Sequence, residues 1–444
     1  MHPGWLHPVR IVPVGLIAAI AVGTLLLMLP AARAGPEGAD FFTALFTATS
    51  AICATGLSIN NTSEYWTAFG HVIITVLTQV GGYGIITAAM LTMLLVSHQL
   101  GLRGRLVLAA ESTRLTLGNA RPLLLWTAMT VLICEAVIAV ILAVRFWTSY
   151  DYPLGRAAWH GLFHAVQAFN NCGFALFTAD PTRLVSDAWV SLPLTLGVVV
   201  GSLGFPVLFE LGRSWHKPRL WSIHTRLTVW GSLILLTIGL LAVLYFERNN
   251  QATIGPMSPA TRLLVAFVLG AIPRSGGFYA VDFGAMHEES LAFTTILMFI
   301  GGGSASTAGG IKVTTFFLLA YVIWAELRGE PDVVIGRRRI AGVTQRQALT
   351  VALLSVALVT VATLVLTAET TGLPMNHILF EAVSAFSTAG LTLGITRELP
   401  IAGQVVLMFL MFVGRLGTIV AASALAINTR RRHYRYPEER PIVG

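Results

Sequence analysis

Charged residues are scarce in this chain: Asp, Glu, Lys and Arg together make up only 11% of its 444 residues. Hydrophobic residues make up 55%, and the mean hydropathy is +0.74. A soluble core cannot bury so much apolar surface, so the composition excludes a soluble protein and indicates a polytopic membrane protein. Cysteine is scarce too. Its three residues lie in apolar or glycine-flanked runs, which gives neither a disulfide framework nor a metal cluster.

Apolar segments of two lengths alternate along the chain. Some are long enough to cross a bilayer, for which about 20 residues are needed. Others are too short to cross and are therefore predicted to be re-entrant half-helices. The eight long segments are residues 11–29, 67–97, 122–147, 188–212, 227–246, 290–325, 347–367 and 401–427, and the four short ones are 42–54, 158–171, 261–274 and 376–388.

Two or three residues after each short segment stands a glycine that is followed by Leu or Phe, and a phenylalanine stands ten residues before that glycine. The four glycines are Gly56, Gly173, Gly277 and Gly390. Because the same pattern occurs four times, we predict an all-α membrane fold of four repeats around a central pore. Each repeat consists of a helix, a half-helix, a loop and a second helix, and all four repeats run in the same direction through the membrane. The predicted repeats cover residues 1–98, 99–220, 221–340 and 341–444, the last with a cytoplasmic tail.

Positive charge is concentrated on one predicted side. Two crossings per repeat return the chain to its starting side, and most of the 29 Lys and Arg residues lie in the termini and in the linkers between repeats. The positive-inside rule then predicts a cell-membrane protein with cytoplasmic termini and outward-facing glycine loops. The net charge of +8 therefore needs no nucleic acid. The clusters 337–339 and 430–432 are either stop-anchor flanks or docking surface for an acidic partner or anionic lipid.

The glycine loops have the composition of an ion filter. Rings of backbone carbonyls can replace the hydration shell of a cation, and aiming successive carbonyls at one axis requires backbone angles that glycine adopts most readily. Close helix packing is the alternative for any single glycine. Four loops in register favour the filter, whose predicted residues are Ala54, Thr55, Gly56, Asn171, Cys172, Gly173, Ser275, Gly276, Gly277, Thr388, Ala389 and Gly390.

A second glycine-rich stretch predicts a loop beneath the filter. Residues 301–310 hold five glycines inside an apolar span, and each costs about 1 kcal/mol in a helix relative to alanine. Irregular backbone at that depth needs protein or a water-filled cavity around it. Arg415 lies inside the last span and needs carbonyl partners, so we expect it to bond this loop and hold the pore closed. The predicted gate consists of Gly301, Gly302, Gly303, Ser304, Ala305, Ser306, Thr307, Ala308, Gly309, Gly310, Lys312 and Arg415.

These motifs resemble the Trk/Ktr/HKT superfamily of potassium transporters, and the Ktr-type membrane subunit most of all. The resemblance covers nearly the whole chain; Gly276 departs from the Ala or Thr expected at that position. It implies a potassium-translocating subunit that holds K+ by filter carbonyls, with Na+ as a further activating or coupling ion. It also implies a homodimer with one pore per protomer and a cytosolic ring of nucleotide-binding regulatory subunits. This chain itself shows no nucleotide-binding domain.

Two other functions fit parts of the sequence. A sodium-conducting relative would share the fold, because carbonyl rings alone do not decide which ion fits. A membrane-embedded enzyme would need converging titratable groups, and the spans offer no His/Glu metal pattern or Ser/His/Asp set, so we expect no enzyme. Glu135 is either a proton-relay group or, in our preferred interpretation, a hydrogen-bonded structural residue. Arg274 and Glu381 are expected to brace the filter from behind.

Overall fold

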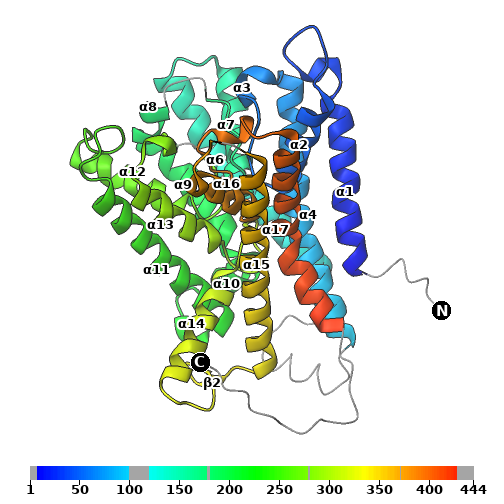
Figure 1. Ribbon diagram of the computed structural model, residues 1–444, viewed down its shortest axis with the longest axis vertical. Coiled ribbons are helices and arrows are strands. Elements are labelled where there is room, and N and C mark those ends of the chain that lie inside the picture. The colour runs from blue at the N-terminus through cyan, green and yellow to red at the C-terminus, as the bar shows by residue number, and fades with distance from the viewer. Residues whose placement is uncertain (1–7, 100–119, 178–180, 279–280, 371, 428–444) are drawn as a thin grey trace, which may run out of the picture.

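The fold is built from helices. The structure, a computed structural model, describes residues 8–99, 120–177, 181–278, 281–370 and 372–427. Within these ranges the strands are one antiparallel hairpin, β1 (Val334–Ile335) and β2 (Arg338–Arg339), with Val334 opposite Arg339. The all-helical prediction therefore holds apart from this hairpin, which lies at the lower end of the molecule in Figure 1.

The longer helices alternate with short ones, as the two lengths of apolar segment predict. The short helices α2, α7, α12 and α16 all lie in the upper half of Figure 1. In chain order the elements are α1 (Pro8–Leu27), η1 (Pro30–Ala32), α2 (Phe41–Ile52), α3 (Thr62–Tyr65), α4 (Ala68–Gln99), α6 (Ala120–Ser149), α7 (Leu154–Phe169), α8 (Pro181–Ser186), α9 (Ala188–Leu203), α10 (Phe205–Ser214), η2 (Pro218–Leu220), α11 (Ile223–Phe246), α12 (Pro259–Ala271), η3 (Phe283–Ala285), α13 (Glu288–Phe299), α14 (Val313–Leu327), α15 (Gly342–Glu369), α16 (Met375–Phe386), η4 (Ile395–Arg397) and α17 (Ile401–Ile427).

The short helices are buried at the centre of the fold. The phenylalanines that stand ten residues before the loop glycines are fully buried in three of them, at Phe46, Phe163 and Phe380. Phe267 in α12 is only half-buried, so the third copy packs differently. Asp40 caps the start of α2 by accepting a hydrogen bond from the Phe42 amide, and the hydroxyl of Ser258 does the same for α12. A polar cap residue thus marks the start of α2 and of α12.

The outer helices present an apolar surface. Among the described residues, Leu125–Ser149, Ile223–Phe246 and Gly342–Glu369 are each long and apolar enough to cross a membrane. Large apolar side chains such as Leu132, Leu241 and Leu353 remain more than half exposed on them. Exposed apolar faces of that length are stable in lipid rather than in water. The molecule is therefore a multi-pass membrane protein.

One predicted span is not continuous. Residues 188–212 form α9 and α10, which meet at an angle of 100° at Gly204, where φ is +92°. A Cβ at Gly204 would lie 2.4 Å from the carbonyl oxygen of Ser304, and the Phe205 amide donates to Ala305 across 3.2 Å. The segment is bent because the loop between α13 and α14 passes here and accepts the hydrogen bond of the Phe205 amide.

The segment 290–325 is interrupted where its glycines predict. Helix α13 ends at Phe299 and α14 begins at Val313, with irregular backbone between them. That backbone is not left unpaired, because Gly301 donates to Ile311, Ile311 donates to Phe299 and Val313 donates to Gly302. The break inside an apolar segment is tolerated because the surrounding protein satisfies it.

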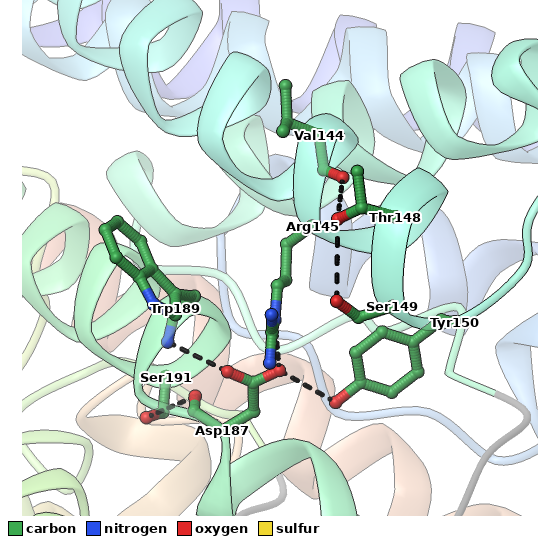
Figure 2. A network of polar contacts seen from close by, with 8 residues as sticks. All are labelled: Val144, Arg145, Thr148, Ser149, Tyr150, Asp187, Trp189 and Ser191. Atoms are coloured by element: carbon green, nitrogen blue, oxygen red, sulfur yellow. Dashed lines mark hydrogen bonds and ion pairs between the residues drawn. The ribbon is translucent and has the colours of Figure 1, made fainter.

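A polar network on Asp187 joins the end of α6 to the start of α9 (Figure 2). The Asp187 carboxylate caps α9 through the Trp189 amide, pairs with Arg145 at 2.7 Å and accepts from the Tyr150 hydroxyl at 3.2 Å. Burial, with the neighbouring Asp187 carboxylate, raises the pKa of Tyr150 to about 12, so its hydroxyl remains a donor at neutral pH. The network fixes both helices that pack around α7.

Candidate functional site

The four loops that follow the short helices meet at one place. A Cβ added to Gly56 would lie 2.0 Å from the amide nitrogen of Gly173, and one added to Gly277 would lie 2.3 Å from the Cα of Gly173. A Cβ on Gly390 would lie 2.0 Å from the carbonyl oxygen of Thr55. The loops of Gly56, Gly173, Gly277 and Gly390 therefore form a ring, called the ring below, in which the backbone of one loop touches the backbone of the next. Any side chain at these glycines would collide with the neighbouring loop. This is why all four positions are glycine.

The loops share a backbone conformation two residues before each glycine. Ala54, Asn171, Ser275 and Thr388 all have positive φ, between +48° and +86°. Non-glycine residues in this left-handed region cost on the order of 1–3 kcal/mol each and persist only where the surrounding structure enforces them. Four such residues at equivalent positions show that the turn after each short helix is held in place.

Three of the turns are closed by the same hydrogen bond. The amide of the residue before the glycine returns to the carbonyl five residues earlier, from Thr55 to Ser50, Cys172 to Gln167 and Ala389 to Ser384, each at 2.8 Å. This bond satisfies a carbonyl at the helix end. The Thr55 carbonyl is then directed at the second loop, where it accepts from the Gly173 amide at 3.3 Å.

The third loop is closed differently, in agreement with its unusual Gly276. The Gly276 amide donates to Ile272, four residues earlier, at 2.7 Å. Arg274 lies behind the loop, only 2% exposed, and donates to the carbonyl and the hydroxyl of Ser232 in α11 at 3.0 and 2.8 Å. The guanidinium thereby anchors this loop to the helix outside it.

Glu381 anchors the fourth loop in a comparable way. Its buried carboxylate accepts hydrogen bonds from the hydroxyls of Thr392 and Thr396 and from the Leu393 amide. These groups follow Gly390 directly in the chain. Both expected braces therefore lie behind the ring rather than inside it.

The loop of residues 300–312, called the intramembrane loop below, packs directly against the ring. A Cβ at Gly309 would lie 2.4 Å from the hydroxyl of Thr388, and the Gly309 amide donates to the Ser275 hydroxyl at 3.4 Å. The Asn171 side chain donates to the hydroxyl of Thr307 at 2.9 Å. The two groups of residues singled out from the sequence are thus in contact.

Two buried cations hold consecutive carbonyls of the intramembrane loop. Arg415, only 3% exposed, donates to the Thr307 carbonyl, and Lys312 donates to the Ala308 carbonyl at 2.6 Å. The structure gives Nε and Nη2 of Arg415 no hydrogen-bond partner. Two basic side chains therefore lie beside the ring.

Glycines of the second helices back the short helices. A Cβ at Gly81, Gly201 or Gly414 would lie 1.8–2.1 Å from the carbonyl oxygen of the last residue of α2, α7 or α16 respectively. Close packing thus explains why these positions are glycine. At Gly301 in the third copy, an added Cβ would instead lie 1.8 Å from the carbonyl oxygen of Gly309 in the loop that follows α13.

A buried polar cluster that the sequence did not reveal supports the second loop. Glu135 in α6, 4% exposed, accepts from the side chains of Gln79 in α4 and Asn170 at 3.2 and 3.1 Å, and Asn170 donates to Gln79 at 2.7 Å. Asn170 precedes the left-handed Asn171 in the chain. Of the two interpretations of Glu135, the structure agrees with the hydrogen-bonded structural residue; only its partners could not be named beforehand.

The family model that describes TrkH, a cation transport protein, matches residues 14–431. This chain belongs to the TrkH family of cation transport proteins. The resemblance drawn from the glycine loops is thereby confirmed, and the chain is a transport protein and not an enzyme.

Named relatives within the TrkH family align over almost the full length. The Ktr system potassium uptake protein B of Bacillus subtilis (strain 168) is 36% identical over 98% of this chain and 97% of its own. The protein of the same name from Vibrio alginolyticus is 32% identical over 98% and 94%. The potassium/sodium uptake protein NtpJ of Enterococcus hirae is 31% identical over 99% and 98%.

The fold is that of a solved TrkH structure. The potassium transporter TrkH from Vibrio parahaemolyticus superimposes with a TM-score of 0.72, covering 97% of this chain and 87% of that one at 18% sequence identity. The two chains therefore share one fold.

Proposed function

We propose that this chain is the potassium-translocating membrane subunit of a K+ uptake system. The observation that carries the proposal is the meeting of four glycine loops, each after a buried short helix, so closely that only backbone fits between them. Two of the aligned relatives are named potassium uptake proteins and a third a potassium/sodium uptake protein. Four helix, half-helix and helix repeats around a central pore, with the boundaries given above, account for this arrangement.

The ring provides the ligands that a dehydrated monovalent cation needs. Backbone carbonyls of Thr55, Gly277 and Ala389 lie at the junctions between loops, and carbonyl dipoles bind a cation without adding a net charge. We expect the left-handed residues before them to hold these carbonyls close to the path of the ion. K+, as the transported ion, would pass from one set of carbonyls to the next along residues 54–56, 171–173, 275–277 and 388–390.

The intramembrane loop would act as the gate. It blocks the path by its position against the ring and by two basic side chains: Arg415, which bonds the loop from α17, and Lys312, which bonds within the loop. Opening requires the Thr307 carbonyl to leave Arg415, so it is coupled to a movement of α17 or of the loop. The glycines at both ends of the loop permit that rearrangement.

Control would come from outside the chain. We expect cytoplasmic termini, a homodimer and a nucleotide-binding ring that docks on the basic linkers; two relatives are named as parts of a Ktr system. Arg339 in β2 is exposed at the hairpin and pairs with Asp332 at 2.8 Å, which leaves its neighbours Arg337 and Arg338 for a partner or for anionic lipid. The cluster 430–432 lies outside the described residues.

A preference for sodium, or transport of both ions, is the second candidate, favoured by the name of the Enterococcus relative. Expression in a strain that lacks potassium uptake distinguishes the two. Wild type should restore growth on low potassium, whereas Gly56→Ser, which adds a side chain where none fits, should restore it poorly. Failure of wild type to restore growth when a regulatory ring is supplied, together with sodium uptake by the same cells, would establish the sodium alternative.

A further inference from the structure

Thr307 connects the intramembrane loop to the backbone of the ring. Its side chain is fully buried, and its hydroxyl both accepts from the Asn171 side chain at 2.9 Å and donates to the Phe169 carbonyl at 3.2 Å. Its amide donates to Gly201 in α9 at 3.3 Å, and its carbonyl accepts from Arg415. One residue of the loop is therefore bonded to the end of α7, to the second filter loop, to α9 and to α17.

A second connection reaches the third and fourth filter loops. The Ser275 hydroxyl donates to the Thr388 carbonyl at 2.8 Å and accepts from the Gly309 amide at 3.4 Å. Asn171, Ser275 and Thr388 are three of the four left-handed residues that shape the ring. The fourth, Ala54, has no polar side chain. The loop is therefore hydrogen-bonded directly to the second and third filter loops, and it reaches the fourth through Ser275.

We propose that the intramembrane loop sets the shape of the ring as well as blocking it, and that Thr307 is the positioning residue through which it does so. The inference rests on the proposed function. When the loop moves away, the Asn171 amide and the Phe169 carbonyl both lose their partner in a buried site, which is costly. The second filter loop therefore rearranges, so opening the gate and changing ion preference become one event.

A loop that only occludes the pore makes a different prediction. Removing one of its contacts would then raise the uptake of every permeant cation by the same factor and leave their ratio unchanged. The coupled mechanism changes the ratio itself. The ratio of K+ to Na+ uptake into liposomes containing the purified protein is thus the informative quantity.

Thr307→Val keeps the shape of the side chain and removes the hydroxyl. We expect it to lower the K+ to Na+ uptake ratio about tenfold, the effect of one lost buried hydrogen bond, while Thr307→Ser retains the wild-type ratio. The matched control is Thr363→Val in α15, whose buried hydroxyl bonds only to Val359 of its own helix at 2.9 Å. This control should keep the wild-type ratio.

A double-substitution cycle makes the test independent of any one variant. Asn171→Gly removes the partner side chain and tolerates positive φ, so Thr307→Val added to Asn171→Gly should change the ratio less than it does in the wild-type background, through loss of the Phe169 bond alone. Equal changes in K+ and Na+ uptake by Thr307→Val, or an additive effect in the double variant, would overturn the coupling. If Thr307→Val does not yield a monodisperse protein, the ratio of Asn171→Gly alone decides, with an unchanged ratio refuting the proposal. Arg415→Ala tests the gate separately through total uptake, so failure of the gate and failure of the coupling appear in different variants.

Discussion

Arg415 in α17 donates a hydrogen bond to the backbone carbonyl of Thr307, 108 residues earlier in the chain. The next carbonyl, of Ala308, is held by Lys312. An arginine inside an apolar helix is costly unless it finds such partners. The carbonyl partner satisfies a strongly basic side chain at this depth. In the proposed function, transport would be controlled at this contact between the last helix and the intramembrane loop.

Removing the charge of Arg415 should release the intramembrane loop. We expect Arg415→Ala to raise cation flux into liposomes about tenfold or more, because a charge-assisted hydrogen bond contributes about 1.5–3 kcal/mol and each 1.4 kcal/mol is tenfold. Arg397→Ala is the matched control, because Arg397 is exposed in η4. Flux through Arg415→Ala that equals that of the control would show that Arg415 does not hold the gate.

Lys312 should act through the same loop, so its effect should not multiply with that of Arg415. Lys312→Met removes the charge and keeps the length of the side chain; we expect a smaller rise in flux. Once either cation is lost the loop is already partly released, so the double variant should conduct less than the product of the single effects implies. Fully multiplicative effects would show two independent barriers.

We expect that replacing a glycine of the ring is harmful because the new side chain has no space, and not only because of the backbone angle. Gly390 and Gly394 have similar φ, +76° and +88°, but a Cβ at Gly394 meets nothing within 4 Å. Gly390→Ala should therefore reduce transport at least about tenfold, whereas Gly394→Ala should lose only the roughly 1 kcal/mol of stability that strain costs. Tracer uptake and thermal unfolding of both variants distinguish the two effects. Similar transport by both would remove the packing argument.

Glu135 should contribute to stability through the second loop. Glu135→Ala leaves the amides of Gln79 and Asn170 without their shared acceptor, which should lower the free energy of unfolding by about 1–3 kcal/mol. Glu135→Gln keeps one acceptor oxygen and should lose less. The unfolding temperatures in detergent should therefore fall in the order wild type, Gln, Ala; a Gln variant less stable than the Ala variant would contradict this account.

The sequence predicted those features whose signal is local and repeated. Apolar lengths indicate spans, and a glycine that recurs ten residues after a phenylalanine locates the loops. Five glycines within residues 301–310 likewise predicted a break in a helix. Each of them costs about 1 kcal/mol in a helix relative to alanine.

Features that depend on distant partners could not be predicted. Gly204 resembles any packing glycine until the carbonyl of Ser304 is seen beside it, and the bend there needs a loop about 100 residues later. Glu135 acquires its role from Gln79 and Asn170 on two other elements. Thr307 was one of several small polar residues in its loop, and its four connections belong to the tertiary structure alone.

The most direct test of the central claim is the position of the transported ion. Crystals grown with Rb+ or Tl+ in place of K+ would reveal bound cations by anomalous scattering. We predict a peak enclosed by the loops of Gly56, Gly173, Gly277 and Gly390, lost when Na+ replaces these ions. Anomalous peaks elsewhere in the molecule, with none between the four loops, would contradict the account.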